Sequence, residues 1–239
     1  MTVQPRPLPR RALLGAGLAL AANGCVTPRN MTAASSPDIW TFDRLTAVGG
    51  HAVTAEGQPL LIDSPYGRAI RFDGVDDALF IDNHPLAGAR HFTFEALFRP
   101  DGGAHEQRWF HLQEAPPTTD ATQWPGTRFL FEIRVYDRQW SLDAFTKGPG
   151  YNQTLLFPDR LHPVGQWAHV AQTYDGTTYR SFVNGVLQGE APLAFQPQGA
   201  GATSVGCRFN RVNYFNGAVR AAAFSRRALA PSAFSLLKS

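Results

Sequence analysis

The chain has 239 residues, 44% hydrophobic and 12% aromatic, which is enough apolar material for one large folded domain. Residues 1–25 hold three of the 22 basic residues and no acid, so 19 basic and 19 acidic residues remain. The remainder is therefore neutral and has no Lys/Arg cluster, which argues against a nucleic-acid partner.

The first 25 residues have the pattern of an export signal. Arg10 and Arg11 precede an apolar run, residues 12–22, that is too short to cross a bilayer. The paired arginines resemble a twin-arginine signal, which directs export in bacteria. Gly24-Cys25 resembles a lipobox that lacks the usual leucine three residues before the cysteine. We expect an exported protein, periplasmic or envelope-anchored, that contacts the membrane only through a possible lipid on Cys25.

The rest of the chain divides into a tether and one domain. Residues 26–37 are rich in Thr, Asn, Ser, Ala and Pro, and we expect a flexible tether there. Residues 38–239 show no linker and no internal repeat, so we expect one domain. If Cys25 is lipidated, Cys207 has no partner for a disulfide. If Cys25 is not lipidated, a Cys25–Cys207 disulfide can form, but we do not expect one.

Period-two alternation predicts many short strands. In residues 91–99 one face carries Phe92, Phe94, Ala96 and Phe98, and residues 128–136 alternate in the same way. Other strands are predicted at 39–42, 69–72, 78–81, 107–113, 139–145, 167–174, 179–183, 205–209 and 218–224. Asp-Gly and Asn-Gly pairs at 73–74, 101–103, 175–176, 184–185 and 216–217 predict turns between them. With one short helix at 231–237, the pattern indicates an all-β sandwich or barrel.

Four segments in order carry a family resemblance: residues 72–81, 92–100, 167–186 and 214–229. Together they resemble the bacterial laminin G-like, or concanavalin A-like lectin/glucanase, domain. The resemblance implies a jelly-roll sandwich of two antiparallel sheets, one of them concave. Most motif residues are then structural, and we expect Phe72, Trp167, Tyr174 and Phe182 in the core.

The resemblance also bears on metal binding. Family members often hold a structural Ca²⁺ with an acidic residue shortly after a Phe-x-Gly motif. Here that place is taken by Arg220, and a guanidinium cannot ligate a cation. We expect no metal site of this kind and no cofactor.

The candidate site comes from the strands expected to form the concave sheet: 91–99, 107–113, 128–136 and 139–145. Their non-core sides mix aromatic, acidic, amide and basic side chains, as sugar-binding surfaces do. The predicted ligand-binding residues are His91, Glu95, Trp109, His111, Gln113, Glu132, Arg134, Asp143 and Arg211. The same strand faces also carry Arg128 and Gln139. A cluster before the last predicted hairpin either rims the groove and contacts an anionic sugar or only solvates a loop; its residues are Arg208, Asn210, Arg211, Asn213 and Tyr214.

Three functions remain open. We expect first a non-catalytic carbohydrate-binding protein whose partner is a polysaccharide or oligosaccharide. A glycan-cleaving enzyme is the alternative, a hydrolase using Glu132 with Glu95 or a lyase with His111 as base and Arg134 neutralising a uronate. Glucanases of this fold carry a Glu-x-Asp-x-x-Glu run, and residues 131–134 offer only one carboxylate, so an enzyme is less expected. The third candidate is a structural or adhesion module.

Overall fold

The computed structural model describes residues 36–115 and 126–237. The predicted export signal, the lipid site at Cys25 and residues 26–35 of the predicted tether lie outside the described residues, so these expectations stay predictions. Within the described ranges, no helix is long and apolar enough to span a membrane.

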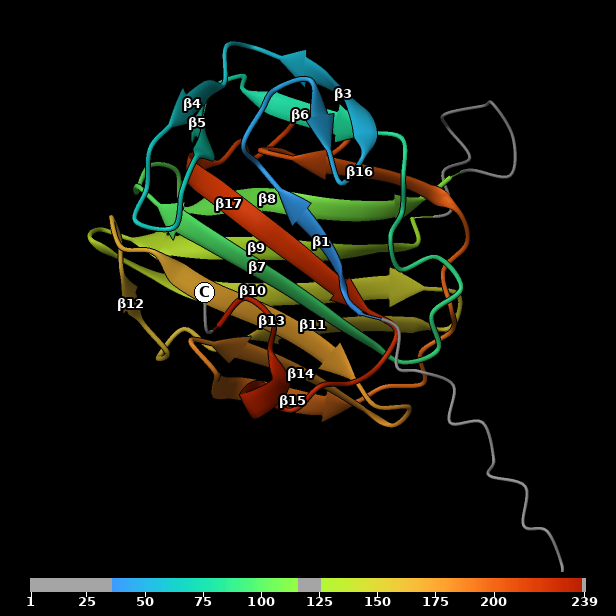
Figure 1. Ribbon diagram of the computed structural model, residues 1–239. Helices are drawn as coiled ribbons and strands as arrows, with labels where there is room; N and C mark the ends of the chain where they lie inside the picture. Colours follow the sequence, from blue (N-terminus) through green and yellow to red (C-terminus); the bar gives the residue numbers. More distant parts are fainter. Residues whose placement is uncertain (1–35, 116–125, 238–239) are drawn as a thin grey trace, which may run out of the picture. The chain divides into compact units, whose positions relative to one another are not determined.

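Within these ranges, seventeen strands form two antiparallel sheets that lie one behind the other (Figure 1). The eight-stranded sheet has the order β15-β14-β13-β7-β17-β5-β4, with β1 also paired to β17. Its strands are β1 (Asp38–Thr41), β4 (Leu60–Ile62), β5 (Ala69–Asp73), β7 (Phe92–Pro100), β13 (Ala168–Tyr174), β14 (Thr178–Val183), β15 (Val186–Pro192) and β17 (Asn216–Ser225).

The nine-stranded sheet has the order β11-β10-β9-β8-β16-β6-β3-β2, with β12 also paired to β10. Its strands are β2 (Ala47–Val48), β3 (His51–Glu56), β6 (Ala78–Ile81), β8 (Glu106–Glu114), β9 (Arg128–Tyr136), β10 (Gln139–Gly148), β11 (Tyr151–Leu156), β12 (His162–Pro163) and β16 (Gly201–Val205). Two stacked antiparallel sheets confirm the predicted jelly-roll sandwich.

The core lies between the inner faces of the two sheets, where aromatic rings interdigitate. The ring of Phe94 on β7 lies 5.0 Å from Phe110 on β8 and 4.4 Å from Phe131 on β9. All three rings are fully buried, so they bring the two sheets into direct contact. Burial of such large apolar surfaces is the main stabilising contribution to a sandwich fold. Trp167 differs from the prediction, because it is half-buried beneath the Arg99 guanidinium rather than in the core.

The prediction that residues 91–99 belong to the same sheet as the other three long strands is wrong. β7 pairs with β13 and β17, whereas β8 pairs with β9 and β16. The chain passes from one sheet to the other through residues 101–105, where Gly102 and Gly103 have positive φ angles. Alternation shows that a strand has one buried face, and it cannot show which sheet the strand joins.

Turn predictions met different outcomes. Asn184 and Gly185 both have positive φ and connect β14 to β15, as a two-residue hairpin requires. Asn216 is instead the first residue of β17, paired with Asp73. The strand predicted at 205–209 ends at Val205, and residues 206–215 form a loop, which we call the β16–β17 loop. The predicted helix is a short 3₁₀ turn, η2 (Pro231–Ala233).

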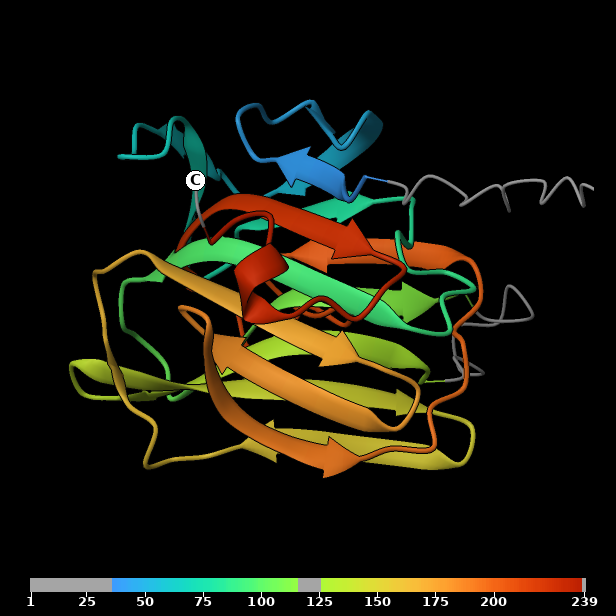
Figure 2. The same cartoon turned by 60° about the horizontal axis from the view of Figure 1, so that its bottom comes forward.

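A C-terminal segment, residues 226–237, lies against the eight-stranded sheet on its solvent side (Figure 2). The Phe234 ring contacts Phe182 on β14 and His169 on β13. This segment explains why β7 and β13 are buried on both faces, although each strand has only one face toward the core.

Candidate functional site

The solvent side of the nine-stranded sheet, which we call the outer face, carries the polar side chains of β8, β9 and β10. The ladder places Asp143 opposite Glu132, and Glu132 opposite Arg108. Residues two positions apart on one strand share a face, so Arg134 lies on this face beside Glu132. Neighbouring strands therefore bring charges that are far apart in sequence into one surface.

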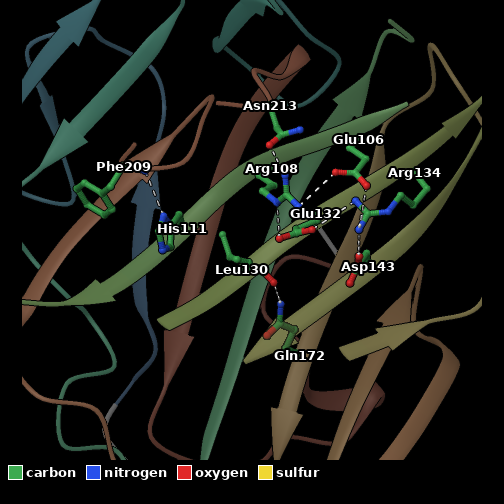
Figure 3. Close-up of polar contacts among 10 residues, drawn as sticks. All are labelled: Glu106, Arg108, His111, Leu130, Glu132, Arg134, Asp143, Gln172, Phe209 and Asn213. Carbon is green, nitrogen blue, oxygen red and sulfur yellow. Dashed lines mark hydrogen bonds and ion pairs between the residues drawn. The ribbon is translucent and has the colours of Figure 1, made fainter. Parts of the chain in front are cut away.

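One end of the outer face holds a charged cluster, made of Glu106, Arg108, Glu132, Arg134 and Asp143 (Figure 3). Glu132 accepts from Arg108 Nε at 2.9 Å, and its second oxygen lies 3.4 Å from Arg134. Arg134 also reaches the Asp143 carboxylate at 2.7 Å. Each arginine thus lies between two or more carboxylates, and both carboxylate oxygens of Glu132 are occupied by protein donors.

Asp143 is the most deeply buried acid in this cluster. Burial, followed by the charge of the neighbouring Glu132, raises the pKa of Asp143 to about 7, and Arg134 offsets only part of this shift. Asp143 is 1% exposed, and no hydrogen-bond partner for its Oδ1 is found among the described residues.

The other end of the outer face holds a pocket of about 530 Å³, which we call the basic pocket. Its walls come from the ends of β8 and β9 and from the β16–β17 loop. The lining residues are His111, Gln113, Gly126, Arg128, Arg208, Phe209, Asn210 and Arg211. These lining residues include three arginines and no acid.

The β16–β17 loop is held over β8 by hydrogen bonds at both of its ends. Gly206 N–H donates to the Trp109 carbonyl, and Arg108 N–H donates to the Asn213 carbonyl. Between these points Phe209 N–H donates to His111 Nδ1 at 3.3 Å (Figure 3). The loop thereby brings Arg208 and Arg211 to the same pocket as the strand residues His111 and Arg128.

His111 is a neutral hydrogen-bond donor in this arrangement. Burial, and then the charges of Arg208 and Arg128, hold the pKa of His111 well below its usual range, so the ring is uncharged at neutral pH. Because Nδ1 accepts the Phe209 N–H, the single ring proton of the neutral imidazole lies on Nε2. His111 Nε2 is buried and has no hydrogen-bond partner among the described residues.

Aromatic rings lie beside the polar groups of the pocket. Phe209 packs against His111 with 5.1 Å between ring centroids and against Phe80 with 5.8 Å. The Arg211 guanidinium lies 4.8 Å above the Phe80 ring and pairs with Glu56. The pocket therefore combines apolar ring surface with N–H donors, a combination that suits the two kinds of surface on a sugar.

The prediction that Trp109 lies on the groove face is wrong. Trp109 is fully buried in the core, stacked between Phe98 at 4.1 Å and Phe131 at 5.4 Å. A β-bulge lies between Arg108 and Phe110 in the β8–β9 ladder, so strict alternation breaks at Trp109. The bulge turns Trp109 inward and places Arg108, which strict alternation puts on the core side, on the outer face beside Glu132.

Glu95 and His91 are also not part of the outer face. Glu95 lies on β7 in the other sheet, is 1% exposed, and accepts hydrogen bonds from Ser235 and Leu236 of the C-terminal segment. His91 precedes β7 and is exposed near the turn at Gly176. Both predictions depended on β7 joining the nine-stranded sheet, so they are wrong for the same reason as that assignment.

The structure brings the other six predicted site residues to the outer face in two groups. Glu132, Arg134 and Asp143 belong to the charged cluster, and His111, Gln113 and Arg211 line the basic pocket. Arg208 and Asn210 also line the basic pocket. Their roles in ligand binding remain predictions.

An acidic group lies elsewhere in the fold. Asp73, Asp76 and Asp77 have ligand atoms within 4.8 Å of one another. The two Asp77 oxygens accept the N–H groups of Gln58 and Asp73, and Asp73 accepts from Val75. Arg220 donates to the Tyr66 carbonyl. The expectation that the chain has no calcium site remains a prediction.

Comparison with known families identifies the class of this protein. A laminin G-type family model, described as the concanavalin A-like lectin/glucanases superfamily, matches residues 73–233. Since this match spans more than half of the chain, the chain belongs to that superfamily, as the four sequence segments indicated. A search of curated proteins gives no match.

Solved structures with low sequence identity share the fold. Domain 4 of AbnA, an extracellular arabinanase from Geobacillus stearothermophilus solved with arabinotriose, has a TM-score of 0.59 at 18% identity, covering 86% of this chain and all of that domain. The receptor-binding domain of botulinum neurotoxin D has a TM-score of 0.57 at 12% identity, covering 82% of this chain and 50% of that one. The NanB sialidase of Streptococcus pneumoniae has a TM-score of 0.53 at 17% identity, covering 68% of this chain and 26% of that one.

Proposed function

We propose that this protein is an exported carbohydrate-binding protein that binds an oligosaccharide or polysaccharide on the outer face of the nine-stranded sheet, with its centre at the basic pocket. The observation that carries the proposal is the pocket itself, where ring surface from Phe209 lies beside donors from His111, Gln113 and Arg128. Sugar hydroxyl oxygens accept such donors, and the apolar face of a pyranose packs against aromatic rings.

The comparisons support a sugar ligand. The arabinanase domain named above was solved with arabinotriose, and a related neurotoxin structure concerns interaction with ganglioside molecules. These ligands belong to those proteins, and identities of 18% and 10% leave the sugar bound by this chain open.

The arrangement of the acids favours binding over cleavage. Glu95 and Glu132 lie on different sheets, so they cannot flank one glycosidic bond as acid and base. Both oxygens of Glu132 are held by arginines. His111 carries its proton on Nε2, so that atom is not a free base for β-elimination in the neutral ring. Glycan cleavage on the same face is the alternative function, and the experiment must distinguish it from binding without cleavage.

Isothermal titration calorimetry of the protein with a panel of neutral and acidic oligosaccharides tests the proposal. We expect heats that saturate at a fixed stoichiometry, and an affinity reduced about 3- to 10-fold in Gln113→Ala, the loss expected for about one uncharged hydrogen bond. Gln153→Ala, an amide on β11 outside the pocket lining, is the matched control and should bind normally. Absence of saturable binding to every saccharide would reject the proposal, and heat that grows with time would indicate turnover instead.

Export and anchoring form a separate part of the proposal. The paired arginines and Cys25 support an envelope location with a lipid attached to the cysteine. Metabolic labelling with a fatty-acid probe should mark the wild-type protein and leave Cys25→Ser unmarked. Equal labelling of both would reject lipidation at this residue, and accumulation of both inside the cell would reject export.

A further inference from the structure

Two arginines of the basic pocket lack a carboxylate partner among the described residues. Arg108, Arg134 and Arg211 on the same face all have ion pairs with acids. In contrast, Arg128 contacts the Gly126 carbonyl and the Phe145 ring, and within the described ranges no ion pair is found for Arg128 or Arg208. The charge on the outer face is therefore segregated, with carboxylates gathered at the charged cluster and unneutralised guanidinium groups at the pocket.

The walls of the pocket also contain donors without acceptors. Among the described residues, three buried nitrogen atoms of its walls have no hydrogen-bond partner: His111 Nε2, Arg128 Nε and Arg208 Nε. All three carry a proton, as shown for His111 by the hydrogen bond at Nδ1. A buried donor without a partner costs free energy, and the cost is larger for a charged group. A ligand that stabilises this pocket must supply acceptor oxygens and negative charge.

The electrostatic environment agrees with this geometry. Burial, and then the charge of Arg208, lower the pKa of Arg128, and burial with the charge of Arg108 lowers the pKa of Arg208. Both pKa shifts have the same cause: each guanidinium group is partly buried and lies close to another positively charged arginine. An anion in the pocket would relieve this repulsion.

We propose that the basic pocket selects glycans that carry an anionic group, a carboxylate or a sulfate, and that Arg128 and Arg208 bind this group. Guanidinium groups form paired hydrogen bonds with both kinds of anion. This inference rests on the proposed function, because it names the class of sugar that the proposed site takes.

The test compares charged and uncharged forms of one saccharide on the whole protein. Calorimetry measures the affinity for oligogalacturonate and for its methyl ester, and for a sulfated galactan oligosaccharide and its desulfated form. We expect at least one anionic form to bind 10-fold or more tightly than its neutral counterpart. If the galacturonate pair shows this difference in affinity, the anion is a carboxylate; if the galactan pair shows it, the anion is a sulfate. The affinity for this form should also fall as NaCl is raised from 50 to 500 mM.

Arginine variants locate the effect. Arg208→Gln and Arg128→Gln should each reduce the preference for the anionic form to threefold or less, because the anionic form loses much more affinity than the neutral form does. Arg138→Gln, at the exposed β9–β10 turn, removes the same charge outside the pocket and should keep the full preference. Unfolding temperatures of the three variants check that the fold is intact.

The outcomes separate the two proposals. If neutral saccharides bind as tightly as their anionic forms, or if Arg138→Gln reduces the preference as much as Arg208→Gln, this inference is overturned and the carbohydrate-binding function stands. If no saccharide of either kind binds to the wild-type protein, the proposed function fails as well.

Discussion

At the scale of single residues, Trp109 shows how position decides role. Its indole ring lies parallel to Phe98 of the opposite sheet, with 4° between the ring planes, and to Phe131 of its own sheet. A fully buried indole cannot stack on a sugar. Trp109 therefore belongs to the stability of the sandwich, and the ring surface available to a ligand comes from Phe209 at the pocket.

Substitution of Trp109 by alanine should lower the free energy of unfolding by about 3–5 kcal/mol, because it leaves a large cavity between the sheets. Urea denaturation followed by circular dichroism measures this loss. Trp167→Ala, which removes a half-buried indole, should cost clearly less. A Trp109→Ala protein of wild-type stability that has lost sugar binding would contradict the buried assignment.

Asp143 predicts a pH dependence. Its pKa is about 7 in the folded protein and about 4 in an unfolded chain, so the folded state binds the proton more tightly. Proton binding by Asp143 therefore contributes to the stability of the folded state. This contribution is fully present below about pH 4 and is lost as the pH rises to about 7. Asp143→Asn should thus become more stable relative to wild type across this range, by about 1.4 kcal/mol for every tenfold difference in proton affinity between the two states.

Thermal unfolding of both proteins between pH 4 and pH 8 measures this difference. Asp159→Asn, which changes an exposed carboxylate, serves as the control and should follow the wild-type curve. Parallel curves for Asp143→Asn and wild type would mean that the carboxyl titrates normally.

At the scale of elements, β7 and the C-terminal segment form one structural unit around Glu95. The carboxylate accepts the N–H groups of Ser235 and Leu236 at 3.0 Å each, and His169 Nε2 lies 3.0 Å from the same group. A buried carboxylate with three such partners is well satisfied. Glu95 therefore fixes the last residues of the chain onto the eight-stranded sheet, whereas the strands of the proposed ligand site belong to the nine-stranded sheet.

Glu95→Gln should destabilise the protein by about 3 kcal/mol, since an amide cannot replace both acceptor oxygens of a buried carboxylate. It should leave saccharide affinity unchanged, because Glu95 is not on the outer face. Thermal unfolding and calorimetry measure the two effects. Glu190→Gln, which breaks the exposed pair with Arg180, should cost less than about 1 kcal/mol. Loss of affinity in Glu95→Gln at normal stability would return this residue to the ligand site.

At the scale of the whole molecule, the stability of the sandwich should not depend on calcium. The oxygens of Asp77 are occupied by backbone N–H donors, and Arg71 lies in the same hollow as the three aspartates. We expect the unfolding temperature to be the same, within about 1 °C, in millimolar Ca²⁺ and in EDTA. A rise of several degrees with Ca²⁺ would show a bound cation in the fold.

The sequence by itself determined the fold class and most of the long strands. Phe92 and Phe94 alternate with the polar residues Thr93 and Glu95, and Asn184-Gly185 fits one turn type, so local patterns were enough. The same alternation correctly placed Glu132, Arg134 and Asp143 on one face, because β9 and β10 are regular and a regular strand presents every second residue to one side.

Only the tertiary structure decided which strands share a sheet and what covers them. β7 has the pattern of any half-buried strand, and its place beside β13 depends on contacts distant in sequence. The bulge at Trp109 reversed the expected face of one aromatic residue, because a single inserted residue shifts a period of two. The basic pocket exists only where the β16–β17 loop folds back on β8 and brings Arg208 to Arg128. No local sequence pattern predicts that Arg208 and Arg128 line one pocket, since this follows from the stacking and order of the strands.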